Sequence, residues 1–170
     1  MKTRAVLAIA VLAAVAVWLG AEQPGPMAST YTDALYGFTI QAPQFPPALP
    51  NTGVVAVQMY APAEQGFAAN VHVMVQRVAT NRQNYRELSL AQFKVGGLTV
   101  NSDTDVTVSG REAIILDYEG MMGDRTLRWL ALAVIDTEQV LLVTCTAPKD
   151  TFAKYEKEFR ACLNSFSVLE

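Results

Sequence analysis

The sequence has little of what most catalytic sites require. It contains one histidine, His72, and two cysteines in 170 residues. It also lacks a G-x-S-x-G nucleophile elbow, an HExxH pair and a glycine-rich phosphate loop. Zinc sites usually need three or four protein ligands, and no His, Cys or carboxylate cluster has that spacing. We therefore expect no catalytic residue, no bound metal and no cofactor.

Basic tracts are absent as well. The 13 Lys and Arg residues are scattered among 16 Asp and Glu residues, and the net charge is −3. Proteins that bind nucleic acid need clustered cations to neutralise phosphates, so we expect no nucleic-acid partner. The apolar share of 51% excludes a disordered tail and fits one ordinary globular domain.

Long apolar runs are missing except near the start, where Lys2 and Arg4 precede small and apolar residues at 5–19. This pattern predicts a removable export signal over residues 1–21. A helix of this run rises about 22 Å, short of a hydrocarbon core of about 30 Å, so an uncleaved anchor is the less favoured alternative. No cysteine follows the run, which excludes lipid attachment there. We expect an exported, periplasmic or extracellular protein with no stable membrane insertion after signal cleavage.

After a flexible leader at residues 22–30, residues 31–170 are expected to form a single domain. Period-two patterns predict strands at 36–41, 54–61, 69–78, 105–108, 112–119, 125–135 and 140–146. The run 130–135 has no polar side chain at its odd or its even positions, which face opposite sides of a strand. That strand is therefore expected at the centre of the sheet, covered on both faces.

Two helices are predicted. A short one starts near Ser89, which forms a capping pattern with Gln92, and stops at Gly96-Gly97. A long C-terminal helix follows Pro148, with Asp150 as its cap. It carries one apolar stripe, made of Phe152, Tyr155, Phe159, Cys162 and Phe166. Most predicted connections between strands are short enough for hairpins, which favours an α+β fold. We expect a twisted antiparallel sheet with both helices packed on it.

Three segments form a recognisable set: YGFTIQAP at 36–43, VSGREA at 108–113, and TCTA at 144–147 ahead of the aromatic stripe. Their arrangement resembles the PsbP-like superfamily, in its bacterial exported, DcrB-like branch. The resemblance implies a PsbP-like fold over residues 31–170 and a non-catalytic accessory or binding role. The chain departs from many relatives in having Phe45 where they carry tryptophan.

Two functions stay open at this point. The favoured one is an exported non-enzymatic accessory or protein-binding module with an envelope protein as partner. The alternative is a small-molecule hydrolase using His72 with Asp117 or Glu119. An enzyme requires these polar groups to converge in a concavity, which separates the two hypotheses.

The candidate binding residues are apolar side chains expected at the surface. If residues 120–124 form a hairpin tip, Met121 and Met122 project from it, and flexible thioethers suit an adaptable contact surface. The alternative is that one or both fold back under the sheet. The proline-rich segment around Phe45 is a candidate second patch.

A calcium-loop pattern also needs testing. Oxygen-bearing residues occupy the template positions, namely Asn101, Asp103, Asp105, Thr107, Ser109 and Glu112. However, Val106 stands where the sharp turn requires glycine, and β-type residues 113–118 follow where a helix should leave. We therefore expect a polar loop leading into a hairpin, without a metal.

The two cysteines, Cys145 and Cys162, both point toward the predicted core. Export alone favours a disulfide between them. An axial offset of about 8 Å and a layer separation of about 10 Å exceed the Cα separation of about 7 Å that a disulfide allows. We therefore expect two reduced, buried thiols.

Overall fold

The computed structural model describes residues 29–43, 45 and 55–169. The predicted signal, residues 1–21, and most of the predicted leader lie outside the described residues. The elements in chain order are β1 (Thr30–Asp33), β2 (Phe38–Gln41), β3 (Val55–Tyr60), β4 (Asn70–Gln76), α1 (Arg82–Val95), β5 (Thr99–Val108), β6 (Arg111–Met122), β7 (Arg125–Ile135), β8 (Val140–Pro148), α2 (Phe152–Asn164) and β9 (Ser167–Val168). Neither described helix is long and apolar enough to cross a membrane.

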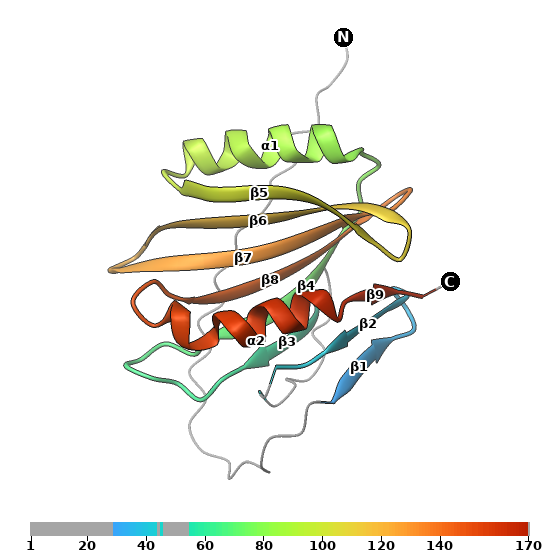
Figure 1. The fold of residues 1–170 in the computed structure, drawn as a ribbon. Coiled ribbons are helices and arrows are strands. Elements are labelled where there is room, and N and C mark those ends of the chain that lie inside the picture. The colour runs from blue at the N-terminus through green and yellow to red at the C-terminus, as the bar shows by residue number, and fades with distance from the viewer. Residues whose placement is uncertain (1–28, 44, 46–54, 170) are drawn as a thin grey trace.

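Six strands form the main sheet in the order β3-β4-β8-β7-β6-β5, and every pair is antiparallel. A second, three-stranded sheet has the order β1-β2-β9. The strand predicted at 125–135 has those bounds, lies in the middle of the main sheet and is buried throughout 129–135. The α+β class with a mostly antiparallel sheet is therefore confirmed (Figure 1).

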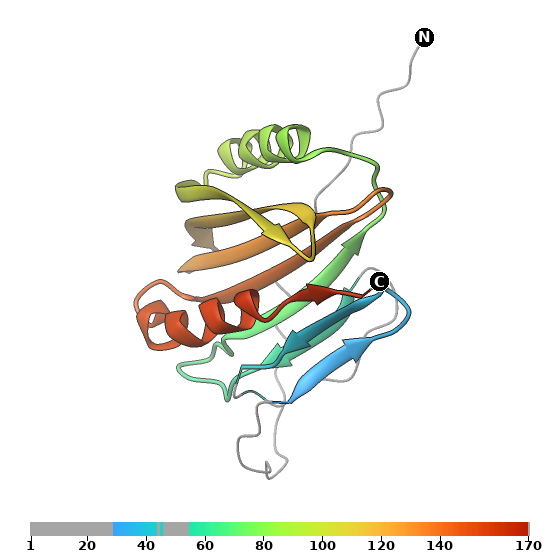
Figure 2. The same cartoon turned by 45° about the vertical axis from the view of Figure 1, so that its right-hand side comes forward.

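The main sheet separates two hydrophobic cores, one under each helix (Figure 2). Leu130, Leu132 and Val134 of β7 join the core under α2, together with β2, Phe45 and β9. The alternate residues Trp129, Ala131 and Ala133 join the core under α1. Period-two geometry thus places one strand's side chains in both cores.

Helix α1 begins seven residues before Ser89, so its predicted start is wrong. Asn81 is the N-cap, and its side-chain oxygen accepts a hydrogen bond of 2.9 Å from the Asn84 amide. Ser89 is buried inside the helix, where its hydroxyl donates to the Tyr85 carbonyl at 2.8 Å. The predicted end at Gly96-Gly97 is confirmed, with Gly97 at a φ of 69°.

Helix α2 has 13 residues and α1 has 14, so the expected contrast between a short helix and a long C-terminal one is not confirmed. The predicted cap is also wrong, because Thr151 rather than Asp150 occupies the N-cap position, without a side-chain capping bond. The apolar stripe is confirmed for Phe152, Tyr155, Phe159 and Cys162, whereas Phe166 lies beyond the end of the helix at Asn164. Its five residues are all buried against the sheet.

Three strand features were missed or underestimated. Strands β1 and β9, of four and two residues, were not predicted. Strand β5 was predicted too short, because it starts at Thr99 rather than at 105. Most of β5 is exposed because it is an edge strand, so it lacks the apolar alternation that marks half-buried strands. Thr30, assigned to the leader, already belongs to β1.

Candidate functional site

A cleft of about 650 Å³ opens at one end of the main sheet. The β3–β4 connection, the β6–β7 turn and the β8–α2 connection meet there. Its lining mixes acidic residues (Glu64, Asp124, Asp150), basic residues (Arg125, Lys149) and apolar or aromatic ones (Phe67, Pro148, Tyr155). Both charge signs beside apolar surface suit a polypeptide segment better than a single small ion.

One wall of the cleft is a tight turn at Gln65-Gly66. Both residues have positive φ, 50° and 78°, and the backbones of Glu64 and Phe67 exchange hydrogen bonds of 2.9 and 3.0 Å. These angles match a hairpin turn with two left-handed residues. The Arg125 guanidinium of β7 donates to the Gln65 carbonyl at 2.5 Å, and Lys154 of α2 forms an ion pair with Glu64. The turn is therefore anchored to both the sheet and the helix.

Met121 lies at the rim of this cleft. Met121 is 61% exposed. Its cross-strand partner on β7 is Thr126, which lines the cleft. The Thr126 hydroxyl donates to the Met121 sulfur at 3.1 Å. The predicted exposed thioether is thus present, and it borders a concave surface.

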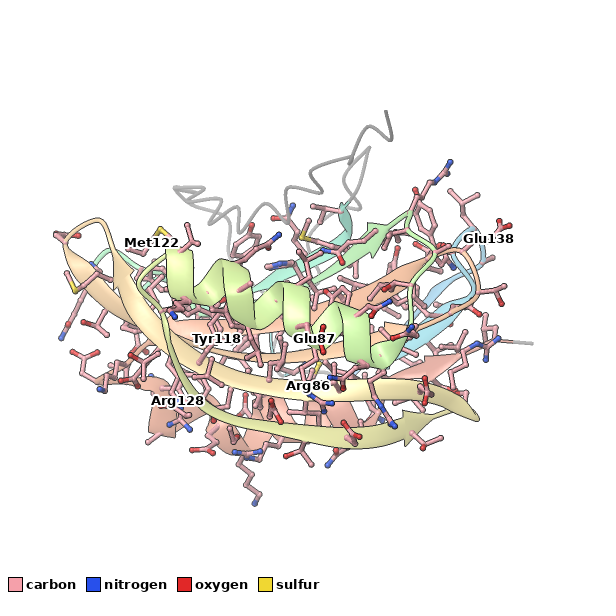
Figure 3. All side chains as sticks on the ribbon, turned by 90° about the horizontal axis from the view of Figure 1, so that it is seen from above. Arg86, Glu87, Tyr118, Met122, Arg128 and Glu138 are labelled. Carbon is pink, nitrogen blue, oxygen red and sulfur yellow. The ribbon has the colours of Figure 1, made fainter. Side chains whose placement is uncertain are left out.

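Met122 points to the opposite face of the sheet. It packs against the core under α1, near the end of that helix (Figure 3). Gly120 lies on the same face against Leu98, and a Cβ at Gly120 would approach the Leu98 side chain within 2.3 Å. Of the two predicted methionines, only Met121 offers most of its surface to solvent.

Phe45 is 5% exposed, so the expectation that it forms a second surface patch is wrong. Its ring packs edge-on against Tyr155 and Phe159, with centroid distances of 5.9 and 6.3 Å. Aromatic pairs in this arrangement belong to the core. Phe45 therefore belongs to the core under α2 and is not among the residues that line the cleft.

A charged cluster borders the cleft on the α2 side of β6 and β7. The Arg128 guanidinium donates to both carboxylate oxygens of Asp117, at 2.9 and 2.7 Å, and lies 4.5 Å from the ring centroid of Phe152. Asn101 adds a hydrogen bond of 3.0 Å to Asp117. Lys149, which lines the cleft, pairs with Glu119 at 2.5 Å. The cluster links the cleft to the middle of the sheet.

Burial raises the pKa of Asp117, but hydrogen bonds from Arg128 and Asn101 and the nearby guanidinium charges outweigh it, so the pKa lies below its usual value. The hydrogen bond from Lys149 is the main reason why the pKa of Glu119 is also lowered. Both carboxylates are therefore ionised and paired. Sequence reasoning missed Arg128, because one arginine in an apolar strand gives no sign of its partner, which lies diagonally across on the neighbouring strand β6.

The alternative catalytic pair does not assemble. His72 lies on β4 between Gln58 and Thr144 of the neighbouring strands, on the face opposite Val71 and Val73 of the α2-side core. Asp117 faces the α2 side, and strands β8 and β7 separate β4 from β6. Glu119 has the same parity as Asp117 and pairs with Lys149. The hypothesis of a hydrolase built on His72 with either carboxylate is therefore wrong for this geometry.

The environment of His72 gives a direct test. Burial lowers its pKa to about 4, so we expect its imidazole resonances to titrate with a midpoint near pH 4 in NMR spectra. Between about pH 6.5 and 4 the unfolded chain binds more protons than the folded one, so stability falls as the pH is lowered. The urea-unfolded chain is the control, with a midpoint near pH 6.5. A midpoint near 6.5 in the folded protein would contradict the burial of this side chain.

The calcium-loop template does not form a loop between helices. Its residues run along β5 and into β6, with the turn at Ser109-Gly110, where both residues have positive φ. Asp103 and Asp105 pair with Arg86 of α1, and Arg82 contacts Asp105. Among the described residues no group of three or more His, Cys, Asp or Glu side chains is placed to hold a metal ion.

Comparisons of sequence find no related group. No family model matches the chain, and no curated protein matches it significantly.

Comparison of structures does find similar folds. The cyanobacterial PsbP (CyanoP) of Synechocystis sp. PCC 6803 superposes with a TM-score of 0.61 at 16% identity, covering 88% of this chain and 98% of that one. LpqN, described as involved in cell envelope biogenesis of Mycobacterium tuberculosis, gives 0.57 at 12% identity, covering 84% and 90%. The protein PA94 of Pseudomonas aeruginosa gives 0.57 at 16% identity, covering 78% and 90%. The fold is therefore PsbP-like, as the sequence resemblance implied.

Proposed function

We propose that this chain is an exported, non-enzymatic accessory module that binds another protein of the cell envelope at the Met121 cleft. The observation that carries the proposal is the exposed Met121 beside a concave surface of mixed charge and apolar character. Large apolar side chains at such positions are typical of protein contact sites. The apolar run at residues 5–19 and the structural likeness to LpqN support an envelope location.

The rigid construction of the cleft supports the same role. Its walls are a hydrogen-bonded turn, a hairpin end and the start of a helix, and side-chain bonds join them. A preorganised surface loses less conformational entropy when a partner binds. Met121 supplies the adaptable part, because a thioether side chain adjusts its shape to the partner.

The test is affinity capture from an envelope fraction with the full chain as bait. Met121→Ser should weaken capture of the specific partner by about five- to thirtyfold, the effect of losing 1–2 kcal/mol at a central contact. Leu35→Ser is the matched control, because Leu35 is also exposed, at 82%, but lies in the β1–β2 turn at the opposite end of the molecule.

Both variants should fold, since neither side chain belongs to a core. Equal capture by the wild type, Met121→Ser and Leu35→Ser would remove the Met121 cleft as the contact surface. A loss caused by Leu35→Ser alone would move the interface to the opposite end.

A further inference from the structure

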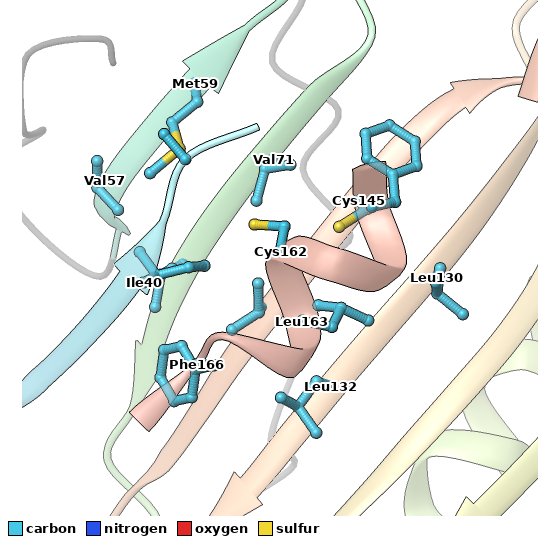
Figure 4. Packing of buried hydrophobic residues seen from close by; sticks show 14 of the residues in the cluster. Ile40, Val57, Met59, Val71, Leu130, Leu132, Cys145, Cys162, Leu163 and Phe166 are labelled. Carbon is cyan, nitrogen blue, oxygen red and sulfur yellow. The ribbon is translucent and has the colours of Figure 1, made fainter. Parts of the chain in front are cut away.

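The two cysteines of the chain meet in the core under α2. Cys145 lies in the middle of β8 and is fully buried, and Cys162 lies in the last turns of α2 and is 1% exposed. Figure 4 shows both side chains in the same packed region between the helix and the strands. Helix α2 therefore brings Cys162 into the same packed region as Cys145.

The two side chains are neighbours in this core (Figure 4). Both are free and buried in this structure. The cross-strand neighbours of Cys145 are Val71 and Leu130, and both belong to the same apolar core. Burial raises the pKa of the Cys145 thiol, and the nearby Cys162 raises it further. These surroundings disfavour a nucleophilic role.

Metal binding is not supported either, because two thiols are fewer than the three or four protein ligands of a usual zinc site. Among the described residues no further His, Asp or Glu joins them in a metal-sized group. The chemistry left to a neighbouring, isolated pair of thiols is their oxidation to a disulfide.

We propose that Cys145 and Cys162 are a disulfide-forming site that covalently joins α2 to β8 when the chain folds under oxidising conditions. Forming the bond requires the two sulfurs to approach to about 2.05 Å, on two elements that already pack in the same core. The site is independent of the Met121 cleft, so it stands or fails separately from the proposed function.

The oxidant is an external disulfide of the glutathione or dithiol oxidoreductase class. A thiolate of one cysteine attacks it and releases one thiol, and the second cysteine then attacks the mixed disulfide and releases the other. The protein loses two hydrogen atoms and two electrons, and one external disulfide becomes two thiols. Because both sulfurs are buried, the exchange takes place before α2 docks or after it opens.

The experiment uses the full chain, unfolded and reduced, then refolded either in oxidised and reduced glutathione or in excess reductant. After unfolding and alkylation without reduction, mass spectrometry should find no modified cysteine in the oxidised sample and two in the reduced one. The oxidised monomer should melt about 10 °C higher, because the bond closes a loop of about 18 residues in the unfolded chain.

The Cys145→Ala, Cys162→Ala double variant is the control, and its melting temperature should not depend on the glutathione buffer. If that variant does not fold, the alkylation count of the wild type still decides the matter. Two alkylated cysteines in the monomer refolded with oxidised glutathione, or disulfides only between chains, would overturn the proposal.

Discussion

Replacing Phe159 with alanine is expected to lower the free energy of unfolding by about 3–5 kcal/mol. The side chain is fully buried, and its ring lies within 5.6 to 6.3 Å of the rings of Phe152, Tyr155 and Phe45. The substitution removes the central ring of this group and leaves a cavity that three neighbours on two segments cannot fill together. Urea unfolding followed by circular dichroism measures the loss.

Val95→Ala is the control for this prediction. Val95 ends α1 and is 91% exposed, so its truncation should change stability by no more than about 0.5 kcal/mol. A loss below about 1 kcal/mol for Phe159→Ala would show that α2 does not dock through this aromatic group. A loss of the expected size would instead identify Phe159 as the main anchor of the helix.

Asp117→Ala should be the second most damaging change, with a loss of about 2–3 kcal/mol near neutral pH. The residue is 4% exposed and accepts three hydrogen bonds from Arg128 and Asn101. Its removal leaves a guanidinium over the Phe152 ring with Glu156, 4.0 Å away, and the charge of the cross-strand neighbour Glu119 as its remaining partners. The lower end of the range reflects that Arg128 is 26% exposed and keeps some water.

The effect of Asp117→Ala should depend on pH. The pKa of Asp117 is lower in the folded protein than in the unfolded chain, so its stabilisation is complete above the unfolded value of about 3.9. It is lost as the pH falls through the folded value. Unfolding of wild type and variant should therefore differ most near pH 7 and converge in strong acid.

Glu64→Ala breaks an ion pair of the exposed kind and serves as the matched control. Its side chain and that of Lys154 are about half exposed, so the loss should stay below about 1 kcal/mol. Equal losses for Glu64→Ala and Asp117→Ala would contradict the importance that we assign to the buried carboxylate.

The parts of the fold that could be predicted are those where one strong pattern acts alone. The residues at 130–135 are apolar on both parities, which requires a strand covered on both faces. The stripe that contains Phe159 requires a helix against a core. In both segments the tertiary structure imposes the same arrangement as the local pattern.

The start of α1 could not be predicted in this way, because two capping signals compete. Ser89 with Gln92 imitates a capping box, whereas Asn81 acts as the cap ahead of a polar first turn. Strand β9 depends on distant partners, with the Val168 amide bonded to the Ser109 hydroxyl and the Leu169 amide to the Gly37 carbonyl. Such contacts leave no local signature.

Met121 was predicted from its place in a hairpin, but the cleft beside it was not. The cleft depends on three loops that are far apart in sequence and on the Arg125 bond to the Gln65 carbonyl. The shared position of Cys145 and Cys162 in one packed region was missed for a similar reason. The predicted separation of the two cysteines assumed that the helix axis runs parallel to the strand. The crossing angle between the helix and the strand decides which of their residues are neighbours.

The division of the domain into two cores also determines what an optical probe would detect. Of the two tryptophans, Trp18 falls in the predicted export signal, and Trp129 stacks on Tyr118 in the core under α1. Met121 and the core cysteines lie on the other side of the sheet. Indole fluorescence of Trp129 therefore describes the α1 face, and a label for the Met121 cleft has to be introduced on the α2 side.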